Sequence, residues 1–562
     1  MSLVGTLNAA KSALAVTQTA IQTTGNNVSN ANTEGYSRQS IQLTPSKGQR
    51  LPGGYVGRGV DLLTVQRQVD DALEARLRAS ISDEAGAAVR TEWLNRIEVV
   101  IGELSDTDLS TAMSEFFNSW SELANKPQDQ GLRQVVLQSG KTLADKIQQQ
   151  YTELQTINDD AFQQLRGDVD RVESLLQQVA EINGQIEDTE GVGGIVANDL
   201  RDVRDNSIRE LAELINARGI VRDDGTTDVY VGSELLVAGN RSFGVQLSTE
   251  EDTGLPRVST LRNDAKLDIR SGRIGGLLAA GEESKAVRDD LDDIAGALIF
   301  DVNRIHAAGQ GTKGLSEVEA GHAVADTTVP LNDPLTELGF TPNNGSFVVN
   351  VTERGTGLTT STLLDVDLDG LGTDTSLDDL AAALDAVAGI GATVNNGRLS
   401  VTSDGGDLTF NFAEDSSGVL GALGVNRFFD GDNAFTIGIN DDLNTDPTLL
   451  AAASNGAPGD NGAARAIAAV QNVATDQLDG FTLSERYEKM TNRVAGRAAD
   501  TAVDAQSASI TRQTLQAQRE ALSGVSLDEE ATNLLRYQQA YQAAARVIAV
   551  VDELMDSLIA IV

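Results

Sequence analysis

The sequence predicts a mainly α-helical protein with long terminal helices and an inserted module of mixed α and β structure. Apolar residues step by three and four positions at both ends of the chain, a spacing typical of helices that pack along helices. The same spacing recurs between residues 70 and 216, whereas residues 315–450 read as short strands and turns. Because the helical segments are nested around this insertion, we expect an elongated multidomain rod with a helical bundle body.

The C-terminal seam is the more regular of the two. It consists of Leu534, Tyr537, Tyr541, Ala544, Ile548, Val551, Met555, Leu558 and Val562. The N-terminal seam is looser and consists of Leu3, Leu7, Ala10, Leu14, Thr17, Ile21, Thr24 and Val28. We expect the two helices to pair with each other and with copies of themselves. Because Thr17 and Thr24 interrupt the apolar stripe, the N-terminal helix is expected to be the weaker partner.

Composition excludes several classes of function. The 562 residues include no cysteine and two histidines, which excludes thiolate metal sites and leaves little for histidine-based catalysis. A net charge of −40 argues against binding nucleic acid through phosphates. No stretch approaches the roughly 20 apolar residues that a membrane span needs, and we expect no cleaved secretory signal.

Local patterns divide the chain into three predicted parts. Residues 1–70 with 523–562 form a terminal coiled-coil assembly domain, and residues 71–314 with 451–522 form a helical body with a β-hairpin. Residues 315–450 form an acidic α+β module, in which 22 acidic residues stand against three arginines and no lysine, a net charge of −19. Within the C-terminal part of the body we expect helices over residues 463–477 and 483–522.

Two motifs flank the terminal seams. Residues 29–36 read SNANTEGY, and residues 523–547 read SGVSLDEEATNLLRYQQAYQAAARV. Both resemble motifs of the bacterial flagellar rod, hook and hook-associated proteins. The N-terminal motif residues are Asn30, Ala31, Asn32, Thr33, Gly35 and Tyr36, and the C-terminal ones are Gly524, Val525, Ser526, Leu527, Asp528, Glu529 and Glu530. The C-terminal motif and the stretch 197–205, ANDLRDVRD, are most similar to the hook-associated members.

The resemblance implies a structural subunit, without cofactor or enzymatic activity, that joins the flagellar hook to the filament outside the cell. Such a chain leaves the cell by type III export, and a cytoplasmic chaperone covers its C-terminal helix beforehand. Its terminal helices stay disordered until they form a coiled coil in a ring of copies. The ring would contact the hook subunit and the second junction protein. Absence of cysteine suits a chain that is threaded unfolded through a narrow channel.

Other functions stay open at this point. The chain could be another axial protein, such as the hook subunit or the second junction protein, although the long helical body favours a first junction protein over the hook subunit. Alternatively, residues 315–450 could carry an adhesin, a glycan-binding module or an enzyme. That alternative requires a pocket with convergent polar groups, and this region shows only distributed aspartate and glycine.

Two further features have simpler interpretations. Asp365–Gly370 copies the beginning of a calcium-binding EF-hand loop, but the twelfth position is Ser376 instead of the glutamate that supplies the bidentate ligand. We expect an acidic surface strand and turn there, with calcium binding as the alternative. His306 lies near a predicted helix end, where we expect it to cap or pack.

Overall fold

The computed structural model describes residues 3–51, 54–102, 108–191, 196–454, 457 and 459–560. The chain divides into two compact units. Unit 1 comprises Met1–Trp93, Asp160–Glu282 and Ala498–Val562, and unit 2 comprises Leu94–Asp159 and Glu283–Arg497. The helices α2 (Asp71–Ile101), α4 (Gln130–Glu190), α6 (Gly272–Ala307) and α11 (Leu483–Ser523) contribute to both units. The predicted mainly helical fold is confirmed, whereas the three-part division and the rod-like arrangement stay predictions.

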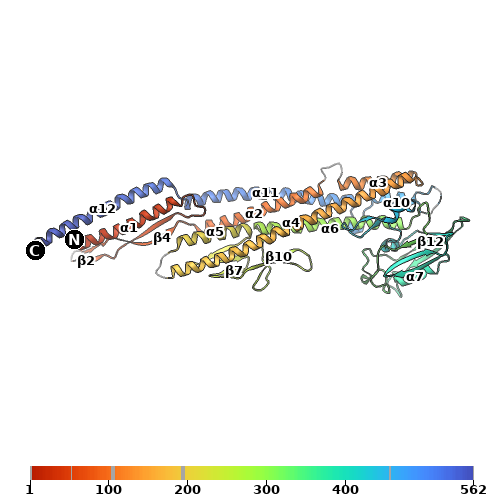
Figure 1. Cartoon of the computed structure of the whole chain (residues 1–562), viewed down its shortest axis with the longest axis horizontal. Helices are drawn as coiled ribbons and strands as arrows, with labels where there is room; N and C mark the ends of the chain where they lie inside the picture. Colours follow the sequence, from red (N-terminus) through yellow and green to blue (C-terminus); the bar gives the residue numbers. More distant parts are fainter. Residues whose placement is uncertain are drawn as a thin grey trace. The chain divides into compact units, whose positions relative to one another are not determined.

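In unit 1 the two terminal helices lie side by side (Figure 1). They are α1 (Leu3–Ser29) and α12 (Leu527–Ile559). After α1 the chain is extended: β1 (Gln39–Pro45) pairs antiparallel with β4 (Val60–Arg67), and both strands contact α1. Between them, β2 (Gln49–Leu51) pairs with β3 (Gly54–Val56).

The rest of unit 1 contains more β structure than the single hairpin that the sequence predicts. After α5 (Asn198–Leu214) the chain forms a four-stranded sheet and then a two-stranded hairpin. The strands are β5 (Arg218–Val221), β6 (Thr227–Val231), β7 (Glu234–Ala238) and β8 (Arg241–Ser242), followed by β9 (Val245–Thr249) and β10 (Pro256–Thr260). Glycines with positive φ at Gly225, Gly232 and Gly239 turn the chain between successive strands of the sheet.

The helical part of unit 2 is built around buried aromatic side chains. Phe116 and Trp120 of α3 (Leu109–Asn125) pack against Phe428, with ring centroids 5.6 and 5.4 Å away. The helix predicted over residues 463–477 was wrong in its second half, because α10 ends at Val470 (Gly462–Val470). The chain then turns, and the β-branched and asparagine residues that follow disfavour continued helix.

The acidic region, residues 315–450 in unit 2, contains two three-stranded sheets as well as helices. It therefore has the mixture of α and β structure that the sequence predicts. One sheet has the order β13-β12-β16 and the other the order β11-β15-β14. The strands are β11 (Glu317–Glu319), β12 (Gly345–Glu353), β13 (Thr359–Val366), β14 (Ile390–Asn395), β15 (Arg398–Ser403) and β16 (Leu408–Ala413). The other elements are α7 (Leu377–Asp385), α8 (Val419–Leu423), β17 (Phe429–Asp430), β18 (Gly438–Ile439) and α9 (Asp441–Thr445).

Candidate functional site at the junction of the terminal helices

The N-terminal motif forms the turns that follow α1. The backbone N–H of Asn30 still donates to the Asn26 carbonyl, and that of Thr33 donates to the Asn30 carbonyl, each at 3.0 Å. The asparagine side chains reinforce these turns, since Asn30 Nδ2 donates to Asn26 Oδ1 at 2.9 Å. The motif therefore ends the first helix with side chains that replace the missing backbone partners.

Asn27, in the last turns of α1, is the centre of the site and is 1% exposed. Its Oδ1 accepts from the hydroxyl of Tyr36 at 2.8 Å and from the backbone N–H of Gln39 at 3.0 Å. Its Nδ2 donates to the Gln39 carbonyl at 2.9 Å and to Glu530 Oε2 at 3.0 Å. Burial and the carboxylates of Asp199, Asp202 and Glu530 raise the pKa of Tyr36, so its hydroxyl stays a donor.

Glu530 brings the C-terminal motif to the same place. It is 2% exposed, and its Oε1 accepts from Arg38 Nε at 2.9 Å and Nη2 at 2.7 Å. The exposed Glu529 accepts from Arg38 Nη1 at 2.8 Å. The backbone N–H of Arg38 also donates to the Ser523 carbonyl at 2.9 Å. The acidic first turn of α12 is therefore fixed to the segment that follows α1.

The third motif, the acidic stretch 197–205, lies on α5 and completes the site. Asp202 accepts from the backbone N–H of Ser37 at 3.2 Å, and Arg67 donates to Asp202 at 2.7 Å and to Asp205 at 2.9 Å. Burial alone would raise the pKa of Asp205, but Arg204 and Arg67 lower it below its ordinary value. We call the group Asn27, Tyr36, Arg38, Gln39, Arg67, Asp202, Asp205 and Glu530 the terminal junction.

Gly35 allows the loop to approach the body of unit 1. Its φ is +78°, and a Cβ at this position would overlap the side chain of Asn206 on α5. The Gly35 carbonyl accepts from Arg519 Nη2 at 3.3 Å, and Arg519 Nε also donates to Glu74 Oε1 of α2 at 2.8 Å. The loop thus contacts α5 and α11, and Arg519 of α11 in turn contacts α2. The close approach to α5 requires glycine at position 35.

The predicted seam of α12 is the side of the helix that is more covered. Ala544 and Val551 are buried, and Tyr541 is 37% exposed. The half-buried members are Leu534, Tyr537, Ile548 and Met555. The side chain of Leu558 and the residue Val562 lie outside the described residues. That the residues of this seam form an interface between copies stays a prediction.

The buried side of α1 is formed by small residues more than by the predicted large ones. Its buried members are Ala10, Val16, Ala20, Thr24 and Asn27. Leu3, Leu7, Leu14 and Ile21 are half-buried, and Val28 is 42% exposed. Thr24 is 3% exposed, so it belongs to the packed face and does not interrupt it.

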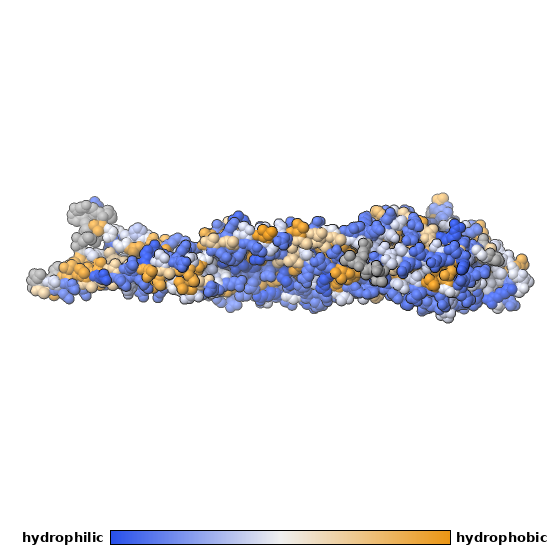
Figure 2. Space-filling view, turned by 90° about the horizontal axis from the view of Figure 1, so that it is seen from above, coloured by the Kyte–Doolittle hydropathy of each residue, from blue (hydrophilic) through white to orange (hydrophobic). Residues whose placement is uncertain are grey.

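A second row of apolar side chains on α12 faces solvent. Its members and their exposed fractions are Val547 41%, Val550 54% and Leu554 49%. Leu535 (60%) and Ile559 (73%) are exposed at other positions around the helix. Figure 2 shows apolar side chains gathered over the terminal helices. No helix in the described part of the chain is long and apolar enough to cross a membrane. A group of exposed apolar side chains is typical of a protein–protein interface.

Half of the terminal junction was not predicted from the sequence. Tyr36 and Glu530 belong to the terminal motifs, and Asp202 and Asp205 lie in the stretch 197–205. No role was predicted for Asn27, Arg38, Gln39 or Arg67. Arg38 lies two residues after the N-terminal motif, and residues 199–205 alternate in charge, a pattern that indicates an ionic network. These two signals could have identified Arg38 and the partners of Asp202 and Asp205.

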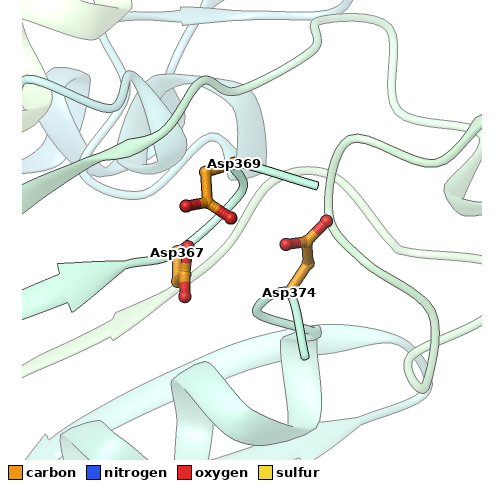
Figure 3. A group of neighbouring side chains, drawn as sticks. All are labelled: Asp367, Asp369 and Asp374. Carbon is orange, nitrogen blue, oxygen red and sulfur yellow. The ribbon is translucent and has the colours of Figure 1, made fainter. Parts of the chain in front are cut away.

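The acidic turn after β13 has three carboxylates close together (Figure 3). Oxygens of Asp367, Asp369 and Asp374 lie within 4.8 Å of one another. Asp369 accepts from the Leu371 N–H at 2.7 Å and Asp374 from the Gly370 N–H at 3.1 Å, so both carboxylates stabilise the turn itself. Ser376, which departs from the EF-hand pattern, is the N-cap of α7 in a capping box with Asp379. The arrangement is that of a surface turn.

His306 packs and bonds in the interior of unit 2. It is fully buried, with Nδ1 2.7 Å from the Asn426 carbonyl, and its Nε2 accepts from the Ala451 N–H at 2.9 Å. Burial, opposed by the bond to Asn426 and aided by Arg133, lowers the pKa of His306 to about 4. The expected packing role is consistent with a neutral ring that joins two loops to α6.

Comparison with known proteins connects these motifs to one family. The sequence model for the flagellar hook-associated protein FlgK helical domain matches residues 94–323. Models for the flagellar basal body rod FlgEFG protein C-terminal region and for the flagella basal body rod protein match residues 516–561 and 7–36. Flagellar hook-associated protein 1 of Escherichia coli K12 is 26% identical over 98% of this chain and 99% of its own length. The Bacillus subtilis 168 protein of that name is also 26% identical, over 98% and 97%.

A solved structure shows the same fold. The flagellar hook junction protein FlgK from Burkholderia pseudomallei has a TM-score of 0.50 at 16% identity, and the match covers 80% of this chain and 100% of that one. The paired terminal helices with rod-type motifs at both ends place the chain among the axial proteins of the bacterial flagellum. More specifically, the chain belongs to the flagellar hook-associated protein 1 (FlgK) family. It is therefore a structural flagellar protein and not an enzyme.

Proposed function

We propose that this chain joins the hook to the filament of the extracellular flagellum, as a subunit held to its neighbours by α1 and α12. The observation that carries the proposal is the terminal junction. There three flagellar-type motifs meet. Asn27 and Arg38 bind Glu530 of α12, and Asp202 of α5 binds Ser37 and Arg67. A subunit that transmits force between the hook and the filament needs such a fixed connection between its assembly helices and its body.

The exposed row of α12 supports the second part of the proposal. Burying a large aliphatic side chain contributes about 1.5–3 kcal/mol, and several members of the row are about half exposed in the isolated chain. Neighbouring copies in a ring would cover them, and the hook subunit and the second junction protein would contact the two sides of that ring. Because most of the stability of a helix comes from packing of its apolar face, the terminal pair is expected to become fully ordered only on assembly.

The same row also suits a chaperone before export. A cytoplasmic protein that covers Val547, Val550 and Leu554 would hide the apolar surface that otherwise promotes aggregation. The net charge of −40 keeps the rest of the chain soluble. Type III export of the unfolded chain would then release it at the growing end of the flagellum.

A charge placed in the exposed row tests the proposal. In cells that lack the natural chain, the double variant Val550→Asp/Leu554→Asp should abolish attachment of filaments to hooks, because two buried carboxylates would oppose assembly. The control is Gln538→Asp/Gln542→Asp, which adds the same charge at exposed polar positions of the same helix. Because Val550 and Leu554 also belong to the proposed chaperone surface, each variant is added as purified protein to cells with bare hooks, which separates assembly from export. Normal filaments on cells with the first variant would contradict the proposal.

Circular dichroism tests the ordering step. If the terminal pair is disordered before assembly, removing residues 534–562 from the isolated chain loses almost no helix signal. A loss equal to the helical content of those residues would show that the pair is already formed in the monomer.

A further inference from the structure

A small pocket in unit 1 has a cationic lining, unusual for so acidic a chain. It lies where β8 and the hairpin β9–β10 meet, and has a volume of about 520 Å³. The lining residues are Arg241, Ser242, Phe243, Leu261 and Arg262. They belong to no motif in the sequence, and the terminal junction does not include them.

Two guanidinium groups share the ring of Phe243. The Cζ atoms of Arg241 and Arg262 lie 5.5 and 5.0 Å from the ring centroid. Both arginines are exposed, whereas the ring is half-buried. Contact with one ring fixes the position of two long side chains that would otherwise move freely in solvent. Both positive charges therefore line the same pocket.

Within the described part of the chain, no carboxylate forms an ion pair with either arginine. Neighbouring cations of the same hairpin are paired, since Arg257 contacts Asp264 at 2.8 Å and Lys266 contacts Glu250 at 2.6 Å. The nearby Glu173 accepts from the backbone N–H of Val245 at 2.9 Å and from Gln177. The pocket thus offers two uncompensated guanidinium groups.

We propose that this pocket binds an acidic side chain on the surface of a second copy of this chain. Planar guanidinium groups bind carboxylates through parallel hydrogen bonds, and Leu261, which is 56% exposed, adds an apolar contact beside them. Each copy carries 83 acidic against 43 basic residues, so copies repel one another unless cationic positions face acidic ones where they meet. This inference rests on the proposed assembly of copies side by side.

Photo-crosslinking in assembled flagella tests the inference. The full chain carries the photoreactive amino acid p-benzoylphenylalanine in place of Leu261, and purified flagella are irradiated. We expect a covalent dimer of the chain, with the crosslink mapped by mass spectrometry to a segment that contains Asp or Glu. The added variants Arg241→Glu and Arg262→Glu should each reduce the dimer roughly tenfold, because like charges then face each other.

The matched control is Arg166→Glu, which removes another exposed arginine that lies over a phenylalanine, 5.5 Å from the ring of Phe162 on α4. It changes the charge equally and should leave the dimer unchanged. A crosslink to a different flagellar protein, to a segment without acidic residues, or to nothing in flagella that contain the chain would overturn the inference alone. Absence of the chain from purified flagella would instead contradict the proposed function.

Discussion

Asn27 and Glu530 are separated by 503 positions in the chain, yet Asn27 Nδ2 donates to Glu530 Oε2 at 3.0 Å. Both side chains are almost fully buried. Asn27 closes the N-terminal helix, and Glu530 lies in the first turn of the C-terminal helix, where the helix dipole favours a negative charge. The bond therefore sets the longitudinal register of α1 against α12, since a shift of either helix by one turn would separate the two groups.

Replacing Glu530 should loosen the terminal helices from the body. Glu530→Ala leaves Arg38 and Asn27 without their buried partner, which costs about 3 kcal/mol for a buried pair. The linker at residues 524–526 should then be cut roughly a hundredfold faster by protease in intact flagella, because cleavage follows the population of the open form.

Glu529→Ala is the matched control for this prediction. It removes a carboxylate on the same arginine, but the side chain is 62% exposed, so the expected cost is below about 1 kcal/mol. Equal cleavage rates for the two variants would show that burial of Glu530 has no special weight.

Gly35 is predicted to be intolerant of any side chain. Gly35→Ala combines a φ of +78° with overlap between the new Cβ and Asn206, and a non-glycine residue in such a conformation costs about 1–3 kcal/mol before the overlap is counted. We expect reduced motility and faster protease cleavage at residues 30–36 in intact flagella, where the terminal helices are expected to be ordered.

The contrasting variant is Gly25→Ala. Gly25 lies inside α1, and a Cβ atom added there would have no neighbouring heavy atom within 4 Å. Alanine should stabilise this helix by up to about 1 kcal/mol. If Gly35→Ala behaved like Gly25→Ala, the loop would not be held against α5 as described.

Local patterns in the sequence predicted what depends on neighbouring residues, and not what depends on long-range register. The seam from Leu534 to Met555 follows from helical periodicity alone, and it does form the covered side of α12. Arg38 and Glu530 are 492 positions apart, and nothing near either residue specifies the other. Thr24 was misjudged because a threonine methyl group packs as well as a small apolar side chain where two helices approach closely. The partners of the terminal junction are set by how three helices meet.

The acidic turn at Asp367, Asp369 and Asp374 is predicted not to bind calcium strongly. Two of its carboxylates already accept backbone hydrogen bonds, and Ser376 caps α7 instead of supplying a ligand. Titration of the full chain with calcium in a calorimeter should give no heat beyond dilution. A saturable heat that the triple variant Asp367→Asn/Asp369→Asn/Asp374→Asn abolishes would identify a site.

His306 should make unit 2 sensitive to acid. Its folded pKa of about 4 lies below the ordinary value of 6.5, so the unfolded chain takes up the proton first. The stabilisation is fully present above pH 6.5 and is lost as the pH falls through 4, and it amounts to about 3 kcal/mol in the free energy of unfolding. Nε2 of the neutral ring accepts a hydrogen bond from the Ala451 N–H. Protonation would put a hydrogen on Nε2, so two N–H groups would then face each other.

The measurement is denaturant unfolding of the full chain at several values between pH 7 and pH 4, compared among three proteins. His306→Gln should have a lower stability at pH 7 and a flatter dependence on pH than the unmodified chain. His322→Gln keeps His306 and should retain most of the steep dependence, although burial also lowers the pKa of His322. Identical slopes for the unmodified chain and His306→Gln would show that carboxylates alone cause the loss of stability in acid.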